Sequence, residues 1–250
     1  MSFSLSSQRA AKHTTNILFL LGMNFCLIGA PGVGKGTFSK LLIQRLKLNH
    51  ISVGDIVRRE IGRKSAVGIQ AQSYVTQGQL IPDEVVNGIV LQEVHKHSSS
   101  NILLDGFPRN VSQAEFLDHH LSDLTAVHIK LDKSVAVEKL LGRRVCSGCE
   151  RSFNIADICR DGYVMPAILP ADAATCPRGA ERCAQLQVLE ERSDDTRDTI
   201  LTRFAVFDTE TAPVIQYYGE KSRLKSFDVK RGVDDIDELI DVMIAPQKDH

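Results

Sequence analysis

One short segment constrains this chain more than any other: residues 29–37 read Gly-Ala-Pro-Gly-Val-Gly-Lys-Gly-Thr. The apolar run Phe25–Ile28 precedes it, and a helical pattern of apolar residues from Phe38 to Leu46 follows it. A strand that leads into a glycine turn and a helix start directs backbone N–H groups and the positive end of the helix dipole at one point. The segment therefore predicts a phosphate-binding loop, the alternative being a purely structural connection between strand and helix.

The side chains of this phosphate loop (residues 29–37) match its predicted role. Lys35 adds a full positive charge, and the glycines let the main chain approach an anion closely. Gly36 separates the lysine from the hydroxyl residue, so we expect Thr37 to be the hydroxyl on the Mg²⁺ side. The residues expected to contact the donor phosphates are Gly32, Val33, Gly34, Lys35, Gly36 and Thr37.

The composition is that of an ordinary soluble globular protein. Of the 250 residues, 43% are apolar and 24% are charged, and the net charge is −1. Such a balance argues against a nucleic-acid groove, so any affinity for anions has to come from local clusters of Arg and Lys. No apolar stretch reaches the length of a membrane span, and no membrane partner is expected.

Residues 1–22 contain basic and hydroxyl residues but no carboxylate, and the first acidic residue is Asp55. Such a segment is typical of a mitochondrial presequence, and equally of a disordered tail or an added strand. A secretory signal is disfavoured because the apolar run at 17–22 merges with the first strand of the core. The expected location is therefore the cytoplasm or the mitochondrion, and the sequence does not choose between these two compartments.

The rest of the chain alternates between two patterns. Short apolar runs lie at 25–28, 102–104, 126–131 and 224–227, and helical patterns lie at 38–46, 83–95, 111–120, 135–142 and 199–217. Buried strands that alternate with helices predict an α/β fold of three layers, a parallel sheet with helices on both faces. A helical stretch at 55–77 and a Cys-, Pro- and Ala-rich block between 142 and 195 interrupt the alternation. Both are interpreted as insertions at the carboxyl ends of the strands, where ligands bind in such folds.

A second motif follows the apolar run at 102–104. Asp105 stands at the end of this strand, where an acid in phosphate-loop proteins holds Mg²⁺ through water; the alternative is a helix cap. Gly106 and Pro108 keep the next turn tight, so that Arg109 points back over the edge of the sheet.

Taken together, the motifs resemble those of adenylate kinases, from about Met23 to the C-terminal helix. They occur in that family's order: residues 29–37, 51–55 with Arg58, 78–83, 105–109 with Gln113, 142–144, 192–195 with Arg203, and 211–213 with Tyr217 and Tyr218. The resemblance implies a P-loop kinase core at 23–51, 82–141 and 196–250. It also implies an insertion that binds the nucleoside monophosphate at 52–81 and a lid at 142–195.

The implied reaction moves the γ-phosphoryl group of ATP to AMP and gives two ADP. An AMP phosphate is already ionised and needs no general base, so the chemistry requires positioning and charge neutralisation. The implied catalytic residues are Lys35, Arg109, Arg143, Arg192 and Arg203. By the same resemblance, Asp194 and Asp195 orient neighbouring arginines rather than take part in the chemistry.

The resemblance also assigns the two nucleotide sites. The implied AMP-binding residues are Val53, Arg58, Gln79, Leu80, Ile81, Gly106, Phe107, Pro108, Arg109, Gln113, Arg192 and Arg203, with Gln113 reading the adenine. On the donor side, Arg143 joins the phosphate loop, and the backbone around Gly232–Asp234 is expected near the base, with Asp234 in the site. Lys139 stands where an Arg often stacks on that base, so both ATP and GTP stay open as donors.

Five of the six cysteines fall within the lid region. Cys146 and Cys149 have the spacing with which some adenylate kinases begin a zinc-binding lid, although the second pair is spaced more widely than in that family. We expect structural Zn²⁺ on Cys146, Cys149, Cys176 and either Cys183 or Cys159, the alternative being a reduced lid without metal. Cys26 is expected to be a small core residue.

Other functions remain open at this point. The acceptor could be UMP or CMP, the donor could be GTP, or the chain could be a nucleotide switch whose zinc lid engages a partner. Arg58, Arg109 and Gln113 argue against a switch, which does not require them. A monomer acting on small-molecule substrates is expected from the resemblance.

Overall fold

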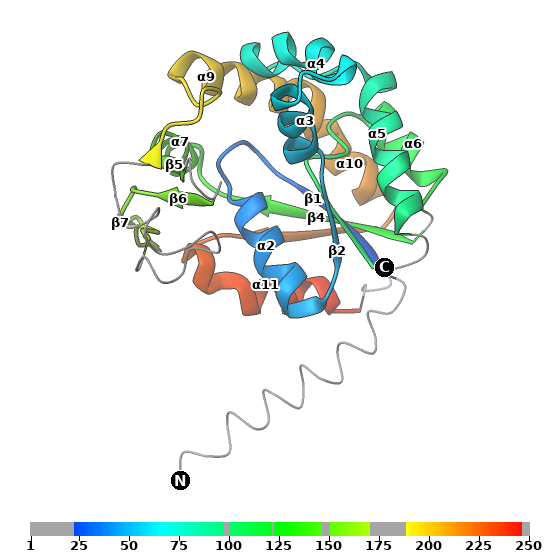
Figure 1. The fold of residues 1–250 in the computed structure, drawn as a ribbon. Coiled ribbons are helices and arrows are strands. Elements are labelled where there is room, and N and C mark those ends of the chain that lie inside the picture. The colour runs from blue at the N-terminus through cyan, green and yellow to red at the C-terminus, as the bar shows by residue number, and fades with distance from the viewer. Residues whose placement is uncertain (1–22, 98–100, 122, 147–150, 171–188, 247–250) are drawn as a thin grey trace.

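The computed structural model describes residues 23–97, 101–121, 123–146, 151–170 and 189–246. Its centre is a five-stranded sheet in the order β10-β4-β1-β3-β2, with every neighbouring pair parallel (Figure 1). The strands are β1 (Asn24–Ile28), β2 (Asn49–Ser52), β3 (Ile102–Asp105), β4 (Leu124–Lys130) and β10 (Leu224–Asp228). Since all five run the same way, their carboxyl ends meet at one edge of the sheet.

Alternation along β1 explains the layers. Phe25 and Leu27 belong to the core cluster that contains apolar residues of α2 (Lys35–Leu46) and α11 (Ile236–Ile244). Cys26 and Ile28 belong to the cluster on the other face of the sheet. Successive strand residues point to opposite faces, so one strand feeds both halves of the core.

The helices that cover the second face are α5 (Asp83–Lys96), α6 (Val111–Asp118) and α10 (Ala212–Glu220). Their apolar residues pack against the same cluster as Cys26 and Ile28. The three-layer α/β fold expected from the sequence is therefore confirmed, and Figure 1 shows the helices on both sides of the sheet.

Two more helices, α3 (Val53–Gly62) and α4 (Ala66–Gln77), follow β2 and rise above the sheet. Gly68 lets them approach closely, because a Cβ there would lie 2.1 Å from the Glu60 carbonyl oxygen. Next to α4 lies α9 (Arg197–Val206), which also packs on α7 (Lys133–Leu141).

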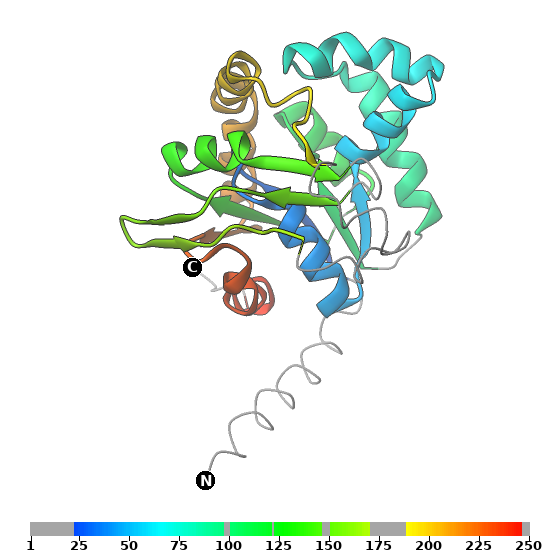
Figure 2. The ribbon, with the colours of Figure 1, turned by 60° about the vertical axis from the view of Figure 1, so that its left-hand side comes forward.

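Short antiparallel strands form the region after α7, where the sequence showed no periodicity. Strands β5 (Arg143–Cys146), β6 (Ser152–Asn154) and β9 (Leu189–Glu190) make one sheet. Strands β7 (Ile158–Arg160) and β8 (Tyr163–Met165) make a hairpin, which projects to the left in Figure 2. The hairpin places Ile158 and Met165 in the same core cluster as α2 and α11.

Two sequence expectations about elements were wrong. Strand β2 was missed because it is a short edge strand in which only Ile51 is buried. The helix expected over 199–217 is broken: α9 ends at Val206, a π-helical turn spans Phe207–Thr211, and α10 begins at Ala212. In the turn, the Thr211 hydroxyl donates to the Arg109 carbonyl at 2.7 Å, which ties the break to the edge of the sheet. Among the described residues, no helix has the length and apolar character needed to cross a bilayer.

Candidate active site

The phosphate loop leaves β1 and ends in α2, as the sequence predicted. Gly34 caps the helix with φ 97°, and Gly32 has φ 84°, both in the left-handed region that favours glycine. A Cβ on Gly32 would lie 2.3 Å from the Ala136 carbonyl oxygen of α7. The loop is thus pressed against the neighbouring helix at a point where no side chain fits.

Lys35 folds back over the loop. Its Nζ donates to the carbonyl oxygens of Gly29 at 2.6 Å and of Ala30 at 2.9 Å. Burial is the main cause that lowers the pKa of Lys35; the Asp105 carboxylate opposes this shift and the positive charge of Arg109 adds to it, and together they bring the pKa to about 7. An anion bound in the loop would favour the protonated amine and raise this pKa.

Three arginines from different elements converge on two carboxylates. Asp195 accepts from Arg143 Nε at 2.6 Å and Nη2 at 2.5 Å, and from Arg203 Nη1 at 3.1 Å. Asp194 accepts from Arg192 Nε at 2.8 Å and Nη2 at 2.6 Å. Such two-point bonds fix the plane of a guanidinium as well as its position.

This cluster carries more positive than negative charge. Burial together with the nearby Arg143 lowers the pKa of Arg203 to about 10, although Asp194 and Asp195 oppose the shift. Burial likewise lowers the pKa of Arg192, and Arg143 adds to that effect. Crowded cations of this kind are stabilised by an anionic ligand.

Two cavities adjoin at this cluster. The smaller cavity is a partly open space of about 680 Å³, a volume that includes open solvent. Its walls are Val53, Val57, Val75, Gln79, Leu80, Ile81, Val86 and Gln113, with Arg58, Arg109 and Arg203 at one side. The larger cavity is lined by the phosphate loop, Asp105, Pro108, Lys139, Arg143, Arg192, Gly232 and Val233. Both cavities share Gly54, Arg58, Gly78, Leu80, Gly106, Arg109 and Arg203.

The cations that face both cavities are held by local contacts. Arg58 pairs with Asp55 one helical turn earlier on α3. Arg109 Nε donates to the Gly106 carbonyl oxygen at 2.9 Å, and burial lowers the pKa of Arg109. A ligand that spans the two cavities would therefore pass between cations.

Comparison with known proteins identifies the family. The family model described as adenylate kinase matches residues 27–223. A protein of Plasmodium falciparum (isolate 3D7) named GTP:AMP phosphotransferase is 35% identical over 90% of this chain and 98% of its own length. Proteins named adenylate kinase from Clostridium tetani (strain Massachusetts / E88) and Geotalea uraniireducens (strain Rf4) are 37% and 36% identical. They cover 82% and 87% of this chain and 91% and 96% of their own lengths.

The chain belongs to the adenylate kinase family. It is therefore a nucleoside monophosphate kinase, and the family implies the use of Mg²⁺ nucleotides.

The residues at the carboxyl edge of the sheet fit a Mg²⁺ ion. Asp105 ends β3 beside the loop, and a Cβ on Gly36 would lie 3.4 Å from its Oδ2. Thr37 is exposed and lines the same larger cavity, so carboxylate and hydroxyl oxygens, the ligands that Mg²⁺ prefers, face one space.

Two predicted site residues of this adenylate kinase lie elsewhere. Phe107 is 1% exposed and packs in the core, because the turn at Gly106 sends its side chain back under the sheet edge. Asp234 is exposed and lines neither cavity, whereas Gly232 and Val233 line the larger one. The other predicted nucleotide-binding residues line one cavity or both.

The predicted zinc ligands fall mostly outside the described residues, since Cys149, Cys176 and Cys183 lie there. Cys146 is buried at the end of β5, and Cys159 is exposed on β7. Within the described parts of the chain, no three His, Cys, Asp or Glu side chains are grouped to hold a metal ion.

Sequence reasoning missed three supporting residues. Asp235 is buried and accepts from the backbone N–H groups of Lys230 and Arg231, both at 2.7 Å, which shapes the turn before Gly232. Asp83 and Asn110 bond to each other and to the predicted base-reading Gln113. Asp83 closes the 78–83 motif, but no role was predicted for it or for Asn110, because their role depends on contacts between α5 and α6 that the spacing does not reveal.

The lowered pKa of Lys35 makes nucleotide binding depend on protons. With a pKa of about 7, roughly a tenth of the amine is charged at pH 8 in the free protein. Bound phosphates favour the charged form, so ATP binding at pH 8 should take up most of one proton. Titration calorimetry in two buffers of different ionisation enthalpy measures this uptake.

The matched control is Lys35→Arg, because a guanidinium stays charged at pH 8 and has no proton to gain. That variant should bind ATP without net uptake. Wild-type binding with no proton uptake at pH 8 would contradict the lowered pKa.

Proposed function

We propose that the chain catalyses the reversible, Mg²⁺-dependent transfer of the γ-phosphoryl group of ATP to AMP, giving two ADP. The observation that carries the proposal is the pair of adjoining cavities with Arg58, Arg109 and Arg203 on both. A protein that only binds one nucleotide needs one cavity. Two cavities that meet at a group of cations suit a donor and an acceptor whose phosphates face each other.

In this proposal the larger cavity takes the donor. Its phosphates lie on the loop residues Gly32, Val33, Gly34, Lys35, Gly36 and Thr37, with Arg143 beside them. Support comes from the backbone geometry of the loop and from the bidentate bond of Arg143 to Asp195. The base would lie toward Lys139, Gly232 and Val233.

The smaller cavity takes AMP. Apolar side chains on its walls, among them Val53, Leu80 and Ile81, suit the faces of an adenine, and the amide of Gln113 suits its polar edge. Arg58 and Arg109 would hold the AMP phosphate where the cavities meet. Gln79, Gly106 and Pro108 complete the walls that face the nucleotide.

The chain's side chains would act by position and charge. Lys35, Arg143, Arg192 and Arg203 would surround the transferring group. Asp194 and Asp195 orient the three arginines before substrates arrive, and the carbonyl oxygens of Gly29 and Ala30 hold Lys35. Charge that develops on the equatorial oxygens then meets fixed cations, and no solvent has to reorganise. A bound Mg²⁺, held by Thr37 and through water by Asp105, would neutralise donor phosphate charge.

The insertions would act as covers. Residues 52–81 supply one wall of the smaller cavity, and residues 142–195 supply Arg143 and Arg192. Closure over both nucleotides would exclude water, which otherwise competes with AMP as acceptor. A monomer suffices for this arrangement, because the cations named above all come from one chain.

GTP is the second donor to test. The Plasmodium relative is named GTP:AMP phosphotransferase. Lys139 lines the larger cavity, and burial lowers the pKa of its amine. An ammonium group stacks on a base less well than a guanidinium does, so this wall gives adenine less support than an Arg would.

Incubation of the pure protein with ADP and Mg²⁺ tests the function directly. We expect ATP and AMP to appear together and in equal amounts, and we expect a metal chelator to stop the conversion. With ATP as donor, AMP should be a better acceptor than UMP or CMP. A protein that gives no conversion of ADP, or only slow hydrolysis of ATP, contradicts the proposal.

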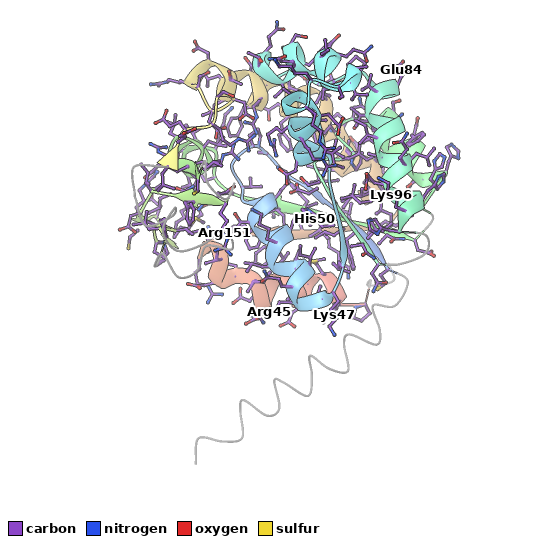
Figure 3. The ribbon with its side chains drawn as sticks, viewed as in Figure 1. Arg45, Lys47, His50, Glu84, Lys96 and Arg151 are labelled. Atoms are coloured by element: carbon purple, nitrogen blue, oxygen red, sulfur yellow. The ribbon has the colours of Figure 1, made fainter. Side chains whose placement is uncertain are left out.

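Arg109→Ala should separate the two nucleotide sites. Loss of a cation that faces the proposed AMP phosphate should raise the KM for AMP by about tenfold or more, and the KM for ATP by much less. Steady-state kinetics with each substrate varied in turn provides the measurement. Arg45→Ala is the control, because Arg45 pairs with Asp237 and neither residue lines a cavity; Figure 3 shows Arg45 near the lower end of α2. Equal effects of Arg109→Ala on both KM values would reassign this residue.

Structural Zn²⁺ in the lid remains a proposal, with Cys146, Cys149, Cys176 and either Cys183 or Cys159 as ligands. Its support is the Cys-x2-Cys spacing after β5. Elemental mass spectrometry of protein never exposed to chelator should find about one equivalent of zinc. Cys146→Ser should lose the metal and Cys26→Ala, in β1, should keep it. Less than about a tenth of an equivalent in the wild type contradicts the site.

A further inference from the structure

The amide of Gln113 is fixed by two contacts that differ in chemistry. Its Nε2 donates to Asp83 Oδ1 at 2.7 Å, and its Oε1 accepts from the backbone N–H of Arg109 at 2.7 Å. The residue is 2% exposed and lines the smaller cavity. Both ends of the amide are thus held by protein groups, on the wall that the proposed acceptor base would face.

These partners leave no freedom to exchange the nitrogen and the oxygen. A carboxylate only accepts hydrogen bonds, and a backbone N–H only donates one. A flipped amide would set its oxygen against Asp83 and its N–H groups against the Arg109 N–H, losing both bonds in a buried place. The orientation therefore follows from the chemistry of the partners.

Asp83 is itself held in place. Asn110 Nδ2 donates to Asp83 Oδ1 at 3.0 Å and Oδ2 at 3.2 Å, and Asn110 Oδ1 caps α6 by accepting from the Gln113 N–H at 2.8 Å. Asp83 also stands in the first turn of α5, where the helix dipole favours a carboxylate. Three side chains from the starts of two helices thus form one connected network.

A count of bonding capacity shows what remains for a ligand. An amide offers two N–H donors and two oxygen lone pairs, and one of each is already used. One donor and one acceptor are left. An adenine edge offers an amino donor beside a ring nitrogen acceptor, which matches that pair. A 6-oxopurine places an acceptor oxygen where adenine has its amino group.

We propose that Asp83 is a specificity-determining positioning residue: it fixes which atoms Gln113 presents, so that a 6-aminopurine monophosphate is accepted and a 6-oxopurine monophosphate is rejected. This inference rests on the proposed placement of AMP in the smaller cavity. The Asp83 carboxylate accepts from Asn110 and Gln113 and lines neither cavity, so it acts through Gln113.

The test measures kcat and KM for AMP and for IMP with ATP as donor. Asp83→Ala should lower the ratio of kcat/KM for AMP to that for IMP by about tenfold, through a higher KM for AMP. The kcat with AMP should change by less than about threefold, because the phosphate-binding cations are untouched. The ratio of kcat/KM values for Asp83→Asn should lie between those of the wild type and Asp83→Ala. Its Oδ1 can still accept from Gln113, while its amide nitrogen would face Asn110 Nδ2.

Two controls separate positioning from a structural effect. Glu84 is exposed on the same turn of α5 (Figure 3), and Glu84→Ala should keep the wild-type ratio. In a Gln113→Leu background, Asp83→Ala should change the ratio by less than about twofold, because the group that it positions is gone. Melting curves establish that each variant folds, and where Asp83→Ala does not fold, Asp83→Asn decides.

Some outcomes overturn the inference and spare the proposed function. They are a wild type that uses IMP as well as AMP, Asp83 variants with the wild-type ratio, and an effect of Asp83→Ala that persists in the Gln113→Leu background. Absence of any AMP-dependent consumption of ATP by the wild type is a different result, which defeats the proposed function itself.

Discussion

The structure depends on holding several cations together in a partly buried place before any anion is bound. Burial and mutual repulsion both oppose this, as the lowered pKa values of Lys35 and Arg203 show. Asp194 and Asp195 offset part of the cost by bonding Arg192, Arg143 and Arg203. Since two carboxylates do not neutralise the whole set, the site keeps an excess of positive charge for its ligands. The same imbalance favours polyphosphates over ligands with a single charge.

The parallel sheet decides where that charge gathers. The phosphate loop, Asp105 and the turn that carries Arg109 all follow strands that end at the same edge. Helix α9 and the short sheet of β5, β6 and β9 then bring the remaining arginines over that edge from segments that follow the phosphate loop by more than a hundred residues. The core carries the loop and the acid, whereas the insertions carry Arg58, Arg143 and Arg192.

Sequence reasoning reached the layers of the fold and most residues around the two cavities, because buried strands, glycine turns and charged motifs leave local patterns. It failed where a local pattern was absent. Strand β2 has one buried residue and gave no apolar run, and the break after Val206 rests on the bond from Thr211 to Arg109. Phe107 looked like part of a binding turn, yet its side chain fills the core. Motif position locates a turn but does not say on which side of the turn each side chain lies.

The proposed recognition of the acceptor base also depends on tertiary contacts that no local sequence pattern reveals. In the proposed AMP site, Val53 lines the smaller cavity with an apolar side chain that has no hydroxyl to read the base, and Gln113 offers a polar amide there. A side-chain amide that is free to flip discriminates poorly between bases, because the flip exchanges its donor nitrogen and its acceptor oxygen. The carboxylate of Asp83 and the backbone N–H of Arg109 remove that freedom. Selectivity in this site therefore belongs to the network that orients the reading group, and a substitution outside the cavity can change it without touching a substrate.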